Sequence, residues 1–144
     1  MIDDLIALCA RRTRLDEGQA RAALAGALGL LDKHAAREPM QAIWREIPGA
    51  EDLARSPEGR VKSGGGLFGG VMKAAGGVSG AAVADAMGLL GRLRKQGVDK
   101  AELKALLPVA EDWVRERTGR DLLREALASV AGVGPMLEGR RGAA

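Results

Sequence analysis

The chain has 144 residues, of which 47% are hydrophobic and 28% charged, a composition that suits one folded domain and excludes wholesale disorder. Its single cysteine and single histidine exclude an intramolecular disulfide and a zinc site built from these two residue types. A net charge of +3 is too mild to indicate a nucleic-acid partner on its own.

Three helices are expected in the first half of the chain. Acidic residues at the start and an apolar stripe predict a short helix over residues 3–12. Asp16 predicts the start of a second helix, because apolar residues follow it at three- and four-residue spacing over 20–35. Pro39 suits the first turn of a third helix, which a Pro-Gly pair ends.

Three further helices are expected in the second half. The first begins near residue 80 and stops at Gly97. Asp99 followed by Glu102 resembles a capping box and predicts a strong start for the next helix. Pro108 should kink or split that helix, because proline has no N–H to donate to the preceding turn. Asp121 should cap the last helix, which runs toward Gly132.

These elements predict an all-α protein, a compact bundle of about six to seven helices. The expected organisation is an N-terminal helical half (1–55), a glycine-rich linker (56–80), a C-terminal helical half (81–133) and a flexible tail (134–144). An offset of 83 residues aligns the helix start at Asp16 with that at Asp99. The hypothesis is therefore that the halves are similar three-helix units sharing one core.

The linker between the halves contains eight glycines from Ser63 to Gly80. The spacing of its glycines matches the dinucleotide-binding fingerprint, but no strand precedes them. A chance match in a glycine-rich linker therefore explains the pattern better than a nucleotide site. Four apolar residues lie among the glycines. In one interpretation they pack onto the helical core; in the other they contact a partner or a lipid surface. These residues are Leu67, Phe68, Val71 and Met72.

Basic residues gather around the turn at Gly97. They can meet phosphates or anionic lipid, or they can simply face water while complementing a helix dipole. No aromatic residue lies among them to stack on bases, which makes a nucleic-acid partner unlikely. The basic residues are Arg92, Arg94, Lys95, Lys100 and Lys104, of which the first three are candidate partner or membrane contacts.

No catalytic constellation is visible in the sequence. His34 has no plausible nucleophile beside it, and Cys9 lies on an apolar stripe as a small core residue does. Trp44 and Trp113 lie on the apolar faces of their helices and are expected to be the packing centres of the two halves. We therefore expect no enzyme activity, no metal and no cofactor.

Four short motifs occur along the chain: Ile47-Pro48-Gly49, the glycine-rich middle, Leu106-Leu107-Pro108 leading to Trp113, and Gly119 followed by Leu122-Leu123. Together they resemble the VcgC/VcgE-like proteins of unknown function. The similarity covers roughly residues 15 to 132. It implies a small helical bacterial protein and supplies no catalytic residues.

The expected function is that of a non-enzymatic protein–protein interaction module in the cytoplasm, with an unknown partner or a second copy of the chain. The alternative is a peripheral membrane protein that uses the apolar residues of the linker together with the basic turn. A small-ligand pocket between the helical halves is a third class, without a residue signature.

Overall fold

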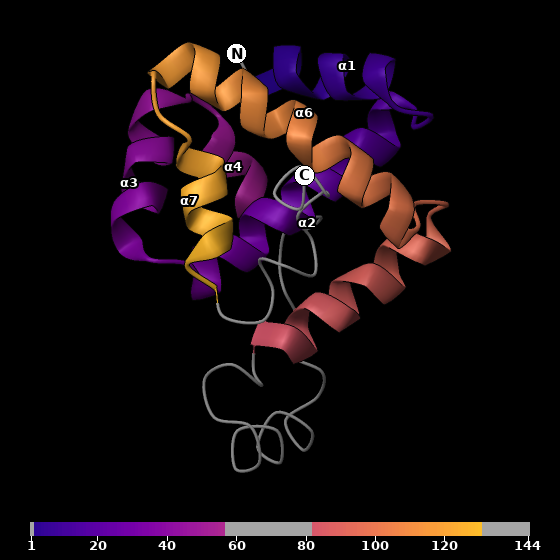
Figure 1. Cartoon of the computed structure of the whole chain (residues 1–144). Helices are drawn as coiled ribbons and strands as arrows, with labels where there is room; N and C mark the ends of the chain where they lie inside the picture. Colours follow the sequence, from indigo (N-terminus) through magenta and orange to yellow (C-terminus); the bar gives the residue numbers. More distant parts are fainter. Residues whose placement is uncertain (1, 57–81, 131–144) are drawn as a thin grey trace, which may run out of the picture.

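The computed structural model describes residues 2–56 and 82–130, and all regular elements within them are α-helices, which confirms the expected all-α bundle. The first half contains α1 (Ile2–Arg12), α2 (Glu17–His34), α3 (Arg37–Glu46) and α4 (Ala50–Ala54) (Figure 1). The second half contains a helix over residues 82–95, α6 (Lys100–Thr118) and α7 (Leu122–Ala128).

The two long helices begin in the same way. The Asp16 carboxylate accepts the Gln19 N–H at 2.7 Å, and the Gln19 side chain accepts the Asp16 N–H at 3.0 Å. Asp99 and Glu102 repeat this pattern at 3.1 and 3.4 Å, so the capping box expected there is confirmed. Each box satisfies N–H groups that the first turn of a helix leaves without intrahelical partners.

Two expectations for the second half, a split at Pro108 and a capping bond from Asp121, are wrong. α6 is one continuous helix that contains Pro108, so no split occurs. Its stripe is fully buried on both sides of the proline, at Leu107 and Ala110, and this packing holds the two parts in one helix. Asp121 lies at the N-cap position of α7 but forms no capping hydrogen bond; its carboxylate lies 3.8 Å from the Arg115 guanidinium.

The short helix α4 was not expected from the sequence. Gly49 precedes it with φ +93, a left-handed conformation that favours glycine. The chain therefore turns sharply after α3 and buries Ala50 and Leu53. A five-residue helix has too few apolar positions to show a period, so only its packing against α2 reveals it.

One hydrophobic core joins the two halves. α1 packs on both α2 and α6, and α3 lies beside α7 (Figure 1). The largest fully buried side chains are all aliphatic: Leu24, Leu30, Leu31, Ile43, Ile47, Leu89, Leu93, Leu103, Leu106, Leu107, Leu122 and Leu127. Trp44 and Trp113 are only partly buried against this core, so their assignment as packing centres is wrong.

The offset of 83 residues also relates the helix boundaries. α2 covers residues 17–34 and α6 covers 100–118; α1 ends at Arg12 and the 82–95 helix ends at Lys95. Similar sequence positions therefore start and stop helices in both halves. The superposition of the halves in three dimensions stays a prediction.

Candidate functional site

The 82–95 helix carries three of the candidate contact residues and lies antiparallel to α2. Near its start, the Asp85 carboxylate lies 2.6 Å from His34 Nε2 and 3.1 Å from Lys33 Nζ, at the end of α2. After its end, the Gln96 carbonyl accepts a 2.9 Å hydrogen bond from the Gln19 side chain, at the start of α2. Both ends of the 82–95 helix are thus fixed.

The two helices approach closely between these ends. Gly26 of α2 faces Leu89, and a Cβ atom at residue 26 would overlap Leu89 Cδ1. Gly97 closes the turn after the 82–95 helix with φ +90, which favours glycine. A Cβ atom there would lie 2.7 Å from the Gln19 amide nitrogen. The glycines therefore allow the turn to lie against the start of α2.

The end of α1 reaches the same part of the molecule. The Thr13 hydroxyl donates to the Cys9 carbonyl at 2.7 Å and accepts the Leu15 N–H at 3.3 Å, which fixes the short connection to α2. Residues 11–14 form one wall of an open hollow of about 620 Å³, and residues 99–105, at the start of α6, contribute the other. Two chain turns distant in sequence therefore meet.

Basic side chains gather on these two turns, and we call this set the basic end. Figure 1 shows the ends of α1 and the 82–95 helix and the start of α6 on the right-hand side of the molecule. Most of the side chains are exposed, and the rest are half-buried. The basic end comprises Arg11, Arg12, Arg14, Arg92, Arg94, Lys95, Lys100 and Lys104.

None of these basic side chains forms an ion pair with a described residue. The nearest carboxylates in sequence, Asp16 and Asp99, each accept a backbone N–H in a capping box, as does that of Glu102. Three local carboxylates therefore serve the fold, and the exposed Glu17 beside them forms no ion pair with these cations.

The contact of α3 with α7 shows the opposite arrangement. The Arg120 guanidinium donates to the Glu38 carboxylate at 3.1 and 3.0 Å and to Glu125 at 2.8 Å. The hydrogen bond from Arg120 lowers the pKa of the Glu38 carboxyl below its ordinary value. The same bonds, to Glu38 first and then to Glu125, raise the pKa of Arg120.

The side chains considered for catalysis do not converge. Cys9 is fully buried, and burial raises the pKa of its thiol to about 12, so it is not a thiolate near neutral pH. His34 contacts Asp85 and not Cys9. Within residues 2–56 and 82–130 no group of His, Cys, Asp and Glu side chains is placed to hold a metal ion.

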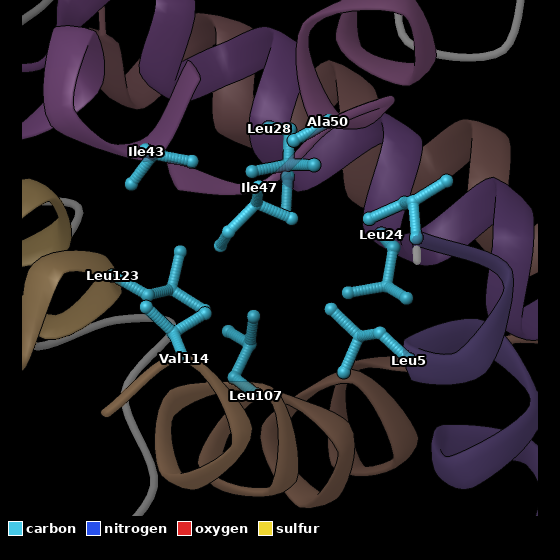
Figure 2. Close-up of a pocket in the computed structure, with 11 residues that line it drawn as sticks. Leu5, Leu24, Leu28, Ile43, Ile47, Ala50, Leu107, Val114 and Leu123 are labelled. Carbon is cyan, nitrogen blue, oxygen red and sulfur yellow. The ribbon is translucent and has the colours of Figure 1, made fainter. Parts of the chain in front are cut away.

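An apolar cavity lies where the two halves meet. Figure 2 shows aliphatic side chains from α1, α2, α3 and α6 pointing toward it. Its volume is about 20 Å³, room for about one water molecule, and it has no polar lining to bind that water. It is a packing defect of the core and not the ligand pocket considered above.

Comparisons with known proteins give no relative for this chain: no family model matches it, and neither does any curated protein or solved structure. None of the described helices is long and apolar enough to cross a membrane. The function must therefore be inferred from the site itself.

Sequence reasoning found part of the basic end. Arg92, Arg94 and Lys95 were expected as contacts, and the structure places them beside a second basic turn at Arg11 and Arg12 that was missed. No local signal in the sequence links the two turns, because they come together only through the packing of α1 on α6. Leu67, Phe68, Val71 and Met72 lie outside the described residues.

Proposed function

We propose that this chain is a non-enzymatic protein–protein interaction module whose basic end binds an acidic surface of its partner. The observation that carries the proposal is the basic end itself, where two turns place cations together without ion pairs. Complementary charge on two surfaces speeds their encounter and fixes their register.

The chemistry of the basic end favours a protein partner over a nucleic acid. No aromatic residue is among the cations, so bases have no side chain on which to stack. Arginine is prominent in the set, and its planar guanidinium binds a carboxylate in a bidentate manner. A cytoplasmic location is part of the proposal, because a lone buried cysteine suits a reducing compartment.

The test uses fluorescein-labelled poly-L-glutamate as an acidic probe, with binding followed by anisotropy at low and moderate salt. The test variant removes four cations of the basic end: Arg11→Gln, Arg12→Gln, Arg94→Gln and Lys95→Gln. The control variant removes four cations elsewhere, with the same change in net charge: Arg45→Gln, Arg55→Gln, Arg115→Gln and Arg117→Gln.

We expect the test variant to lose at least about tenfold in affinity and most of its salt dependence, because local charge governs the association. The control variant should stay close to the unmodified protein. Equal losses in both variants would show that only net charge matters and would contradict a localised binding surface.

A membrane surface is the second candidate, and one observation favours it. The helix that carries Arg92 and Arg94 also carries Met87. The Met87 side chain is 60% exposed, and no other large hydrophobic residue in the described part of the chain is classed as exposed. Gly88 and Gly91 lie beside it with open space around them. An apolar helix face next to cations suits the interface of an anionic bilayer.

Liposome flotation distinguishes the two candidates. Vesicles of phosphatidylcholine alone and with phosphatidylglycerol are compared at low and moderate salt. Flotation with the anionic vesicles that is lost in Met87→Ser would favour the membrane; binding to poly-L-glutamate without flotation would favour the protein partner. The control is Val109→Ser, which changes a half-buried apolar residue of α6 outside the 82–95 helix.

A further inference from the structure

A groove lies between α2, α3 and α4, and none of the residues of the basic end lines it. Its volume is about 400 Å³, within the range of roughly 300–1,000 Å³ typical of small-molecule sites. Asp32 and Lys33, at the end of α2, line one side of the groove. One face of α3 lines another side, and Glu51 and Arg55 line the rest.

One face of α3 supplies both apolar surface and a positive charge. Arg37, Met40, Gln41 and Trp44 all line the groove, and their spacing of three and four residues places them on the same helical face. Met40 is buried with 4% exposure, and Trp44 is partly buried against the core. The accessible part of Trp44, the Gln41 amide and the Arg37 guanidinium thus line the groove, while Met40 lies beneath them in the core.

The charged side chains around the groove pair unequally. Arg55 lies 2.9 Å from the Glu51 carboxylate and 3.6 Å from that of Asp32, so one guanidinium is shared by the two acidic groups of the lining. Lys33 pairs with Asp85. The Arg37 guanidinium has no ion pair with a described residue. An anion entering the groove would meet this cation on the face of α3 that also carries Trp44.

We infer that the groove binds a small organic carboxylate with an apolar body. The carboxylate pairs with the Arg37 guanidinium, whose paired N–H groups match two carboxylate oxygens. The apolar body lies on the accessible part of Trp44, and Gln41 offers an amide for a further hydrogen bond. This site is independent of the basic end, because the two sets share no residue.

The probe is 4-phenylbutyrate, followed by the emission of Trp44 in a Trp113→Phe background in which Trp44 is the remaining tryptophan. The neutral isostere 4-phenylbutyramide tests the need for the carboxylate. Arg37→Gln removes the proposed cation, and Arg45→Gln on the same helix is the matched control, since Arg45 is 71% exposed and does not line the groove. Circular dichroism checks that each variant is folded.

We expect saturable binding of 4-phenylbutyrate, with affinity at least about tenfold lower for the amide and for Arg37→Gln, because a charge-assisted bidentate pair is lost in both. Arg45→Gln should bind as the Trp113→Phe parent does. An unchanged emission of Trp44, equal affinities for acid and amide, or full affinity in Arg37→Gln would each overturn the inference. The four-cation variant of the basic end should keep this binding, so the two proposals fail separately.

Discussion

The contact of α3 with α7 and the basic end use arginine in opposite ways. At the first, Arg120 bridges Glu38 and Glu125 and joins helices from the two halves of the chain. At the second, Arg11 and Arg94 have no carboxylate partner among the described residues. Arginines of this one protein therefore serve its fold at one contact and remain open to a partner at another.

The acidic residues account for this difference. Near the basic end the carboxylates of Asp16 and Asp99 are held by the backbone N–H groups of helix starts. At α7 the aspartate at the helix start, Asp121, forms no capping bond and lies near Arg115. At these two helix starts the aspartates cap the helix, and the neighbouring cations form no ion pair with a described residue.

The largest expected effect comes from the core that both regions share. Leu107→Ala removes a fully buried side chain beside the small apolar cavity and should lower the free energy of unfolding by about 2–5 kcal/mol. Urea denaturation measures it. The four-cation variant of the basic end is the reference and should unfold at nearly the same urea concentration as the unmodified protein. A similar loss in both would mean that the basic end supports the fold.

The capping aspartates should give an intermediate effect that sharpens the comparison. Asp16→Ala and Asp99→Ala should each lower stability by about 0.5–2 kcal/mol, because each removes the acceptor of a helix-start N–H. Each also removes a negative charge near the basic end, so binding of poly-L-glutamate should become tighter. Urea denaturation and anisotropy give the two readouts. Weaker binding in either folded variant would contradict the role given to these carboxylates.

The smallest expected effect depends on pH. Glu38 has a lowered pKa in the folded protein, so its pairing with Arg120 stabilises the fold above the ordinary carboxyl pKa, and this is lost as the pH falls through the lowered value. Arg120→Gln should therefore unfold at a slightly lower urea concentration than the unmodified protein at about pH 7, and the difference should shrink at about pH 3.

Arg94→Gln is the matched control for this experiment, because Arg94 has no ion pair with a described residue. It should match the unmodified protein at both pH values. An equal effect of the two substitutions near neutral pH would remove the distinction between paired and unpaired arginines.

Much of the fold could be predicted from local signals. The periodic stripe of α2 and the aspartates at the starts of α2 and α6 act within a few residues, so the sequence displays them. α4 could not be predicted, because its five residues become helical by packing on α2. The continuity of α6 through Pro108 likewise depends on burial of its stripe in a core shared by both halves.

The basic end likewise has one part with a local signal in the sequence and one part that depends on packing. The basic turn at Arg94 and Lys95 could be predicted from neighbouring letters. Its position near the 11–14 turn depends on how α1 and α6 pack, and the pairing of His34 with Asp85 joins residues 51 positions apart. Such long-range arrangements have no local signal in the sequence.

The most direct test of the central claim is a map of where an acidic ligand binds. Hexaglutamate is titrated into the ¹⁵N-labelled protein, and the amide chemical shifts are followed residue by residue. We predict that the largest shifts fall on residues 11–14 and 94–100, around the basic end, and that the amides of α3 and α7 barely move. Shifts concentrated on α3 and α7, or spread evenly over the surface, would contradict the account.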